Sequence, residues 1–318
     1  MSYDVIALGE LLVDFIQAGL SEQDNIQFEA NPGGAPCNVL AMLSKLGNTT
    51  SFIGKVGADQ FGFMLKATLG KAGIDDSNLL MDQTMNTTLA FVHTLKDGDR
   101  DFSFYRNPGA DMMLQADEVD VESIRKAKIF HFGSLSMTHE TSRLATQKAV
   151  QIAKENGVLV SFDPNLRLPL WPDRESAKQQ AMYGFTHCDI LKISDNEVRF
   201  YTGHEDYDTG ILHLQKTYGI PLILLTLGKY GSRVYYQDKR VEVPGFAVRT
   251  IETTGAGDTF CACILNYILE SGLHQLTEND LESMLTFANA AAALVTTRKG
   301  ALLSMPSEVE VIEFLTDY

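Results

Sequence analysis

Short apolar runs alternate with longer amphipathic segments along most of the chain. The short runs are typical of buried strands, whereas the longer segments repeat their apolar residues at helical spacing. Strands are expected at Val5–Gly9, Ser51–Val56, Lys128–Gly133, Val158–Asp163, Ile190–Ile193 and Leu222–Leu227. Helices are expected at Asp59–Ala72, Thr138–Asn156, Arg174–Thr186, Asp206–Tyr218, Asp258–Ser271 and Glu278–Thr296. This alternation predicts an α/β fold with a mostly parallel central sheet and helices on both faces.

One region breaks the alternation. Thr88–Leu95 and Asp101–Tyr105 have the pattern of strands, and the turn between them contains Gly98, which favours a hairpin. The segment from Ile16 to Phe28 favours further short strands. These strands form either an ordinary hairpin at the edge of the main sheet or a small sheet of their own.

The segment from Glu252 to Phe260 has the pattern of a loop that enters a helix. Its turn, Gly255-Ala256-Gly257, leaves backbone N–H groups uncrowded at the positive end of the helix dipole, where an anion binds favourably. Asp258 follows in the first turn and could take a proton from an attacking hydroxyl. An anion site beside a base is what phosphoryl transfer to an alcohol requires. An ordinary helix cap would use the same residue types.

A second glycine-rich segment, Asn31 to Asn38, opens a predicted helix that ends at Gly47. Gly33 and Gly34 allow the backbone to approach a ligand closely, and the Asn38 side chain offers a donor and an acceptor. A tight turn before a helix is the alternative interpretation.

The composition is that of an ordinary globular protein, with 45% apolar and 21% charged residues. The net charge is −15 and no basic stripe is visible, so a nucleic-acid surface is not expected. An acidic protein that binds a nucleotide must hold the phosphates with local donors. The Walker A phosphate loop is missing, so a nucleotide would have to be bound by other parts of the chain. The G-x-G-x-x-G dinucleotide fingerprint is also missing, which argues against an NAD-dependent enzyme.

The 4 cysteines, at positions 37, 188, 261 and 263, include no C-x-x-C pair and no zinc-type cluster. We therefore expect free thiols in a reducing cytoplasm. No apolar run approaches the ~20 residues of a membrane span. The N-terminus has the pattern of neither a signal peptide nor an anchor.

Taken together, the two glycine-rich segments resemble the two signatures of the ribokinase-like (PfkB) carbohydrate kinases. The first signature corresponds to Gly33–Asn38, Lys45–Gly47 and Gly54–Gly62, and the second to Thr253–Phe260. Their order and separation are those of the family, and the resemblance covers essentially the whole chain. It implies a single ribokinase-like domain, residues 1–318, with a small β-sheet lid formed by about residues 12–30 and 86–110.

The resemblance also implies roles for particular residues. Asp258 is the implied base, and the amides of Gly255, Ala256 and Gly257 stabilise the phosphoryl group, with Arg167 as a nearby cation. The residues implied to bind the sugar are Asp14, Gly33, Gly34, Asn38 and Arg106. Those implied to bind ATP are Lys192, Ser194, Thr226, Gly228, Gly231 and Asn289.

Two ions are implied as well. Glu197 belongs to the N-x-x-E motif that organises Mg²⁺ and phosphate in the family, and it is expected to act on Mg²⁺ through water. Ser194 replaces the Asn of that motif and has a shorter reach. Glu252 and Thr254, with carbonyls of residues 298–301, suggest a monovalent cation such as K⁺, although the family usually has Asp where Glu252 stands.

The substrate is the least determined part of the resemblance. The run from Asp163 to Arg167, together with Trp171, is similar to fructokinases and 2-keto-3-deoxygluconate kinases. The segment from Phe102 to Asp111 favours fructokinase, because Phe102 or Phe104 suits a neutral sugar and could exclude water. The implied reaction is phosphorylation of the 6-hydroxyl of fructose by ATP.

Alternatives are a 2-keto-3-deoxygluconate kinase, another sugar or nucleoside kinase of the family, or a sugar-binding sensor that performs no chemistry. The expected partners are therefore a small-molecule sugar and ATP, without nucleic acid or membrane. A homodimer through the lid is also expected, because exposed strand edges favour pairing.

Overall fold

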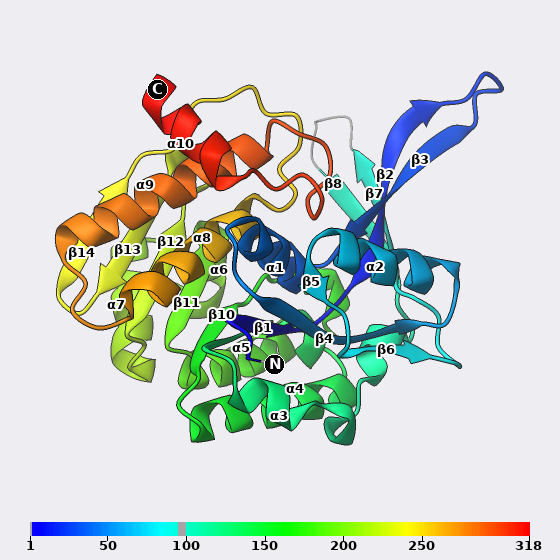
Figure 1. The fold of residues 1–318 in the computed structure, drawn as a ribbon, viewed down its shortest axis with the longest axis horizontal. Coiled ribbons are helices and arrows are strands. Elements are labelled where there is room, and N and C mark those ends of the chain that lie inside the picture. Colours follow the sequence, from blue (N-terminus) through cyan, green and yellow to red (C-terminus); the bar gives the residue numbers. More distant parts are fainter. Residues whose placement is uncertain (1, 95–99) are drawn as a thin grey trace.

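The computed structural model describes residues 2–94 and 100–318, and their side chains except at positions 93–102 (Figure 1). The predicted turn at 96–99 and the side chain of Phe102 lie outside that description. A 10-stranded sheet forms the centre of the described part of the molecule. Its parallel strands are β1 (Val5–Leu8), β4 (Thr50–Gly57), β9 (Ile129–Gly133), β10 (Leu159–Asp163), β11 (Ile190–Ser194) and β12 (Leu222–Thr226). These are the strands that the apolar runs predict.

The two edges of the sheet differ from the prediction. At one edge, β13 (Ser232–Tyr236) and β14 (Lys239–Val243) add an antiparallel hairpin to β12. At the other edge, β4 pairs with the short strands β5 (Ile74–Asp75) and β6 (Leu79–Asp82). The full order is β14-β13-β12-β11-β10-β9-β1-β4-β5, with β6 beside β4. Long apolar runs do not mark these strands, because β5 and β6 have only 2 and 4 residues and most of β14 is accessible to solvent.

Helices cover both faces of the sheet, as predicted (Figure 1). One face carries α1 (Ala35–Lys45), α2 (Gln60–Lys71), α8 (Ala256–Ser271), α9 (Glu278–Val295) and α10 (Glu308–Asp317). The other carries α3 (Val121–Arg125), α4 (Glu140–Glu155), α5 (Arg174–His187), α6 (Asp195–Thr202) and α7 (Tyr207–Tyr218). Short 3-10 helices lie at η1 (Ala110–Met113), η2 (Ala116–Glu118), η3 (Leu135–Met137), η4 (Leu168–Leu170) and η5 (Gly228–Tyr230).

Each face of the sheet has its own hydrophobic core. Along β12, for example, Leu222 and Leu224 belong to the core on the α8 side, whereas Leu225 belongs to the core on the α5 side. Alternate residues of a strand point to opposite faces, so a strand buried on both faces is apolar throughout. This is why the sequence shows unbroken apolar runs rather than alternation. Among the described residues, none of the helices combines the length and the apolar character that crossing a bilayer would need.

A second, 4-stranded sheet projects from one end of the molecule, coloured dark blue and cyan in Figure 1. Its strands are β2 (Leu12–Leu20), β3 (Ile26–Gly33), β7 (Leu89–Thr94) and β8 (Arg100–Tyr105), in the order β3-β2-β7-β8. Phe15 of β2 stacks on Phe91 of β7 with ring centroids 4.8 Å apart, and it meets Phe61 of α2 edge-on at 5.6 Å. The Phe15–Phe61 contact packs this sheet against the body. The strand order shows that the strands outside the alternation form a sheet of their own.

The packing of α5 on β10 generates a stability prediction. A Cβ atom at Gly184 would lie 2.3 Å from Cε1 of Phe162, whose buried ring stacks on Phe132 at 4.7 Å. The ring has no room to retreat, so we expect Gly184→Ala to destabilise the protein by about 1–3 kcal/mol, as overpacked cores do. Urea unfolding monitored by circular dichroism measures the change.

Gly70→Ala is the matched control, because Gly70 also lies in a helix, but beyond its two chain neighbours and the backbone of its own helix no atom comes within 4 Å of its Cβ position. Alanine favours a helix over glycine, so this variant should be unchanged or stabilised by up to about 1 kcal/mol. Equal unfolding midpoints for the two variants would contradict the packing argument.

Candidate active site

The start of helix α8 forms the centre of the candidate site. Gly255, its N-cap, has a φ of 80°, and a Cβ there would lie 2.8 Å from Cβ of Ala301. The Ala256 N–H donates to the Thr253 carbonyl at 3.3 Å, whereas no acceptor is found among the described residues for the N–H groups of Gly255 and Gly257. The predicted anion site therefore keeps free donors at Gly255 and Gly257, while the amide of Ala256 is already engaged.

Two cavities meet at this helix start. The first, which we call the carboxylate cavity because Glu10, Asp14 and Asp258 line it, has a volume of about 420 Å³. The second, which we call the α9 cavity because Asn289, Ala292 and Thr296 of its wall lie on or directly after α9, has a volume of about 540 Å³. Thr253 and Gly257 line both cavities, so a group bound at the start of α8 is in reach from either side.

The carboxylate cavity collects acidic groups from distant parts of the chain. Burial raises the pKa of Asp14 and of Asp258 to about 6, and that of Glu10 to about 7. Removal from water disfavours the charged form of each carboxylate. A ligand that brings several hydroxyl donors would compensate these groups, whereas an anionic ligand would repel them.

Asn38 of α1 holds the proposed base in place. Its Nδ2 donates to Oδ2 of Asp258 at 2.8 Å, which joins the two glycine-rich segments across 220 positions of sequence. Its Oδ1 is buried without a partner among the described residues. A buried acceptor without a donor is costly, so this atom is available to a hydroxyl of a ligand.

A buried ion pair lies beside the base. Lys192 of β11 donates from Nζ to Oδ2 of Asp163 at the end of β10, at 2.9 Å, and both side chains are less than one tenth exposed. A Cβ at Gly257 would lie 3.0 Å from the same Nζ, so the ammonium group faces the start of α8. Burial acts to lower the pKa of Lys192, but the neighbouring carboxylates, chiefly that of Asp163, outweigh it and raise the pKa above its usual value, so the residue stays charged.

Arg167, which the resemblance assigns to the phosphoryl group, and two glycines that it assigns to the sugar lie around this cavity. Arg167 and Gly34 line it. Gly33 lies behind its wall, where a Cβ would fall 2.3 Å from Oδ2 of Asp14, so the glycine leaves room for that carboxylate. Gly34 has a φ of 134° and its Cβ would lie 2.4 Å from the carbonyl oxygen of Glu10, so no other residue fits there without a shift.

Arg106 is placed differently. Its side chain is buried, its Nε and Nη2 bind Asp111, Nη1 binds Thr138, and Nη2 also donates to the Leu135 carbonyl. The structure therefore does not place this guanidinium in the cavity wall; it supports Leu135, which lines the cavity. Direct contact with a ligand would require the Arg106–Asp111 pair to rearrange.

The α9 cavity contains Thr226, Gly228, Gly231 and Asn289, all of which the sequence assigns to ATP. At Gly231 the φ is 106° and a Cβ would lie 2.2 Å from the carbonyl oxygen of Val243, so the β12–β13 turn requires glycine. Asn289 uses its amide to hold the same hairpin: Nδ2 donates to the Val243 carbonyl at 3.1 Å and Oδ1 accepts from Ser232 at 2.9 Å. Its polar groups are therefore hydrogen-bonded within the protein, where they hold the cavity wall in place, and they are not free to bind a ligand.

Ser194 and Glu197 line neither cavity wall. Oε2 of Glu197 accepts bonds from the N–H and the hydroxyl of Ser194, at 2.8 and 2.7 Å, and Oε1 accepts from the Leu166 N–H at 2.8 Å. Both carboxylate oxygens are engaged by the protein. Glu197 thereby fixes the backbone that precedes Arg167, and it does not present a free oxygen to a metal ion.

Glu252 connects two loops beside Gly255. Its Oε1 accepts from the Thr254 hydroxyl at 2.6 Å and its Oε2 accepts from the Gly300 N–H at 3.0 Å. The Glu252 N–H in turn donates to the Thr296 carbonyl. The loops that the sequence assigns to a monovalent cation are therefore brought together, although the carboxylate itself is engaged. Within the described part of the chain, no group of three or more His, Cys, Asp or Glu side chains could hold a metal ion.

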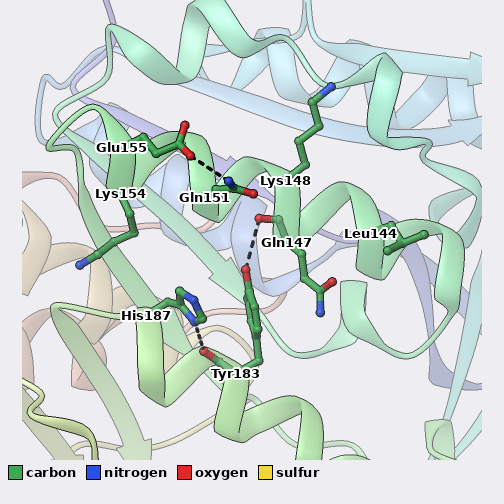
Figure 2. Close-up of a pocket in the computed structure, with 8 residues that line it drawn as sticks. All are labelled: Leu144, Gln147, Lys148, Gln151, Lys154, Glu155, Tyr183 and His187. Carbon is green, nitrogen blue, oxygen red and sulfur yellow. Dashed lines mark hydrogen bonds between the residues drawn. The ribbon is translucent and has the colours of Figure 1, made fainter.

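A further hollow between α4 and α5 belongs to neither cavity (Figure 2). Its cations are occupied: Lys148 donates to the Ala116 carbonyl and Lys154 to Asp189, at 2.7 and 2.9 Å. Tyr183 and His187 stack at 4.1 Å along one side, and the Tyr183 hydroxyl donates to the Gln147 carbonyl. These side chains are satisfied by the protein, so the hollow carries no evident chemistry.

Sequence reasoning missed Glu10 and underrated Asp163. Glu10 lines the carboxylate cavity and Asp163 anchors Lys192. Asp163 is the last residue of β10, and Glu10 follows the end of β1 after Gly9. Ligands bind at the carboxyl ends of the strands in such sheets. Their position at the ends of strands could therefore have identified both residues as candidates for the site. They were passed over because an Asp-Pro-Asn sequence also forms an ordinary turn, and because a charged residue after a strand is common in an ordinary loop.

Comparison with known proteins agrees with the geometry. The family described as pfkB family carbohydrate kinase matches residues 3–308. The probable fructokinase-2 of Arabidopsis thaliana is 44% identical over 313 residues, which are 98% of this chain and 95% of that protein.

Solved structures agree in fold. The fructokinase of Xylella fastidiosa with bound ATP has a TM-score of 0.90 and 30% sequence identity, and covers 99% of both chains. A double mutant of the Vibrio cholerae O395 fructokinase, with bound fructose, ADP and potassium ion, has a TM-score of 0.89 and 31% identity, also over 99% of both chains. The predicted ribokinase-like fold with its small lid sheet is confirmed. The chain belongs to the pfkB family of carbohydrate kinases.

Proposed function

We propose that this protein is a fructokinase that transfers the γ-phosphoryl group of ATP to the 6-hydroxyl of fructose. The observation that carries the proposal is the position of the α8 start, with Asp258 and the free Gly257 N–H, where the two cavities meet. A donor and an acceptor bound on opposite sides of that point would meet at the anion site. The Arabidopsis and Xylella relatives, both described as fructokinases, support the same activity.

The carboxylate cavity would hold the sugar. Asp14 would accept bonds from sugar hydroxyls, and Asn38 would offer its unpartnered Oδ1 while it orients Asp258. Asp258 would then remove the proton from the attacking hydroxyl. Its pKa of about 6 leaves it mostly ionised at neutral pH, yet closer to the operating pH than an exposed aspartate is, as a general base requires.

The charge that develops on the transferred phosphoryl group would be stabilised by the amide of Gly257, the ammonium of Lys192 and the guanidinium of Arg167. Lys192 needs no reorganisation to do so, because Asp163 already holds it toward the helix start. Donors that are fixed in advance, in a site from which water is excluded, contribute most to such stabilisation.

ATP would occupy the α9 cavity. Gly228 leaves its neighbourhood open, and Phe260, Ala292 and Ala293 supply an apolar wall suited to a nucleotide base. Mg²⁺ would be held by the phosphates and would keep several of its waters, as this ion usually does when it binds substrate phosphates. Glu197, engaged by protein donors, would act on that hydration shell only by positioning the Ser194 and Leu166 backbone.

The charges favour a neutral sugar over 2-keto-3-deoxygluconate, which carries a carboxylate of its own. The cavity presents Glu10, Asp14 and Asp258, and the additional cation that an acidic substrate would want, Arg106, is committed to Asp111. Lys192 is likewise paired, with Asp163. An acidic acceptor would thus meet three like charges, and Arg167, the cation of the cavity wall that has no carboxylate partner among the described residues, would have to serve both the acceptor and the phosphoryl group.

An ADP-release assay across fructose, ribose, 2-keto-3-deoxygluconate and aminoimidazole riboside tests the proposed substrate. We expect kcat/KM for fructose to exceed that for 2-keto-3-deoxygluconate by at least about 100-fold, since sites whose buried polar groups are left unpaired by the wrong substrate reject it by about 10⁴-fold or more. A higher kcat/KM for 2-keto-3-deoxygluconate would contradict the proposal and favour the alternative, a 2-keto-3-deoxygluconate kinase. Fructose binding without ADP release would instead indicate a sensor without chemistry.

The role of Asp258 is tested by Asp258→Asn. The amide oxygen can still accept from Asn38, so the fold and the binding of both substrates should persist, while kcat falls at least ~100-fold through loss of the base. Steady-state kinetics with fructose and ATP measure the effect. Asp238→Asn, in the exposed β13–β14 turn, is the matched control and should leave kcat unchanged. Near-normal turnover of the Asp258→Asn variant would remove Asp258 from this role.

A monovalent cation beside the anion site is part of the proposal. The Vibrio cholerae fructokinase structure contains a potassium ion. In this chain, Glu252 joins the loop before α8 to the Gly300 loop, so carbonyls of both loops can converge beside Gly255. The positive ion would strengthen anion binding at the helix start.

Activity in potassium chloride, compared with activity in tetramethylammonium chloride at equal ionic strength, tests the cation. We expect several-fold higher kcat in potassium, because the organic cation is too large for a carbonyl-lined site. Equal rates in the two salts would defeat this part of the proposal.

We further propose a cytoplasmic protein that pairs through its lid. For the compartment, the support is that all 4 cysteines are buried and free, as a reducing compartment permits.

For pairing through the lid, the support is an apolar hairpin tip. Leu20 and Ile26, paired at the tip of the β2–β3 hairpin, are each 58% exposed. A second copy covering this apolar tip would remove it from water.

A further inference from the structure

Glu10 is a buried carboxylate for which the proposed mechanism has no use. It follows β1 after the intervening Gly9, is 3% exposed, and lines the carboxylate cavity together with Asp14 and Asp258. A charged side chain is rarely buried without compensating partners. The partners around Glu10 therefore decide what this residue does.

The position of Glu10 is fixed by close packing between β1 and α1. A Cβ at Gly9 would lie 2.6 Å from Cγ of Pro36, and a Cβ at Gly34 would lie 2.4 Å from the Glu10 carbonyl oxygen. Oε1 accepts a bond from the Ala35 N–H at 3.0 Å, at the first residue of α1. The carboxylate thus caps this helix from another element, because the N-cap itself, Gly34, has no side chain to do so.

These partners leave acceptor capacity unused. A carboxylate has about four lone-pair sites, whereas the hydrogen bond found from another described residue is the single one from Ala35. The positive charge of Arg106 attracts the Glu10 carboxylate, but Arg106 is bound to Asp111, whose negative charge repels the Glu10 carboxylate. The nearby Cys37 thiol is neutral because burial raises its pKa. The net result is that burial still raises the pKa of Glu10 to about 7. A hydroxyl donor in the cavity would supply what is missing.

We propose that Glu10 is a sugar-binding residue, which caps α1 with one carboxylate oxygen and accepts a hydrogen bond from a hydroxyl of the neutral sugar with the other. The inference rests on the proposed function, because it needs a polyhydroxylated acceptor in the carboxylate cavity. Glu10 and Asp14, which follow the same strand, then hold the sugar from one continuous stretch of backbone. A rigid pair of acceptors fixes which hydroxyl is presented to Asp258.

The experiment compares Glu10→Gln with Glu282→Gln, an identical change at an exposed site on α9 far along the helix from the cavities. Glutamine keeps an oxygen for the Ala35 N–H, so the cap and the thermal unfolding midpoint should be retained. Loss of the charge-assisted bond should weaken fructose binding, by calorimetry and by KM, about 10-fold or more, while KM for ATP changes little. Glu282→Gln should change neither.

A set of fructose analogues, each lacking one hydroxyl, identifies the contact. The analogue that lacks the partner of Glu10 should bind the parent protein more weakly but lose little further affinity in the Glu10→Gln variant, because the two changes remove the same interaction. A folded Glu10→Gln variant that binds fructose within about two-fold of the parent overturns the inference and leaves Glu10 as a helix cap. A parent protein that phosphorylates none of the sugars in the acceptor panel refutes the proposed function itself, and the inference with it.

Discussion

Helix α8 begins at the carboxyl edge of a parallel sheet, and its first N–H groups at Gly255 and Gly257 have no carbonyl among the described residues to accept them. Unsatisfied N–H donors at a helix start are ordinary on a surface, where water accepts their hydrogen bonds. Here they lie between two cavities, where a bound anion can accept those hydrogen bonds instead. The arrangement of charges around the site follows from that requirement.

The charges nearest the helix start have opposite signs and are kept apart by fixed partners. Asp163 uses Oδ2 to hold Lys192 and Oδ1 to accept the Asn165 N–H, so the same carboxylate sets both the cation and the turn that leads to Arg167. Asn38 holds Asp258. Beneath them His131 donates to or accepts from Ser161, and burial lowers the pKa of His131 to about 3, so no further positive charge arises there. The site thus carries a base and a cation that do not neutralise each other.

The lid sheet and the sugar side of the site share a single run of chain. Residues 5–14 pass from the buried strand β1 through Glu10 to Asp14 on the lid strand β2. Ile16, Val92 and Phe104 of the lid also line the carboxylate cavity. A movement of the lid would therefore change both the water content of the cavity and the position of its carboxylates, which couples sugar binding to exclusion of water.

Much of the fold and the centre of the site could be predicted because their signals are local. A strand buried on both faces is apolar throughout, so β9, β10 and β12 are visible as runs. Gly34 and Gly255 have positive φ values and close neighbours, requirements that only glycine meets and that therefore show in the sequence. The hairpin β13–β14 escaped prediction because β14 is largely accessible to solvent, and because the pairing of β13 depends on β12 rather than on its own pattern.

The sequence by itself determined the order of the six main parallel strands and of the main helices between them, the two glycine turns, and the carboxylate that stands in the first turn of α8. The tertiary structure alone decided which polar groups remain available to a ligand. Arg106 is paired with Asp111, Glu197 is hydrogen-bonded to Ser194 and Leu166, and Asn289 is hydrogen-bonded to the end of β14. Glu10, in contrast, keeps unused acceptor capacity. The physical reason is that residue type sets what a side chain can donate or accept, but only packing sets which partners reach it first.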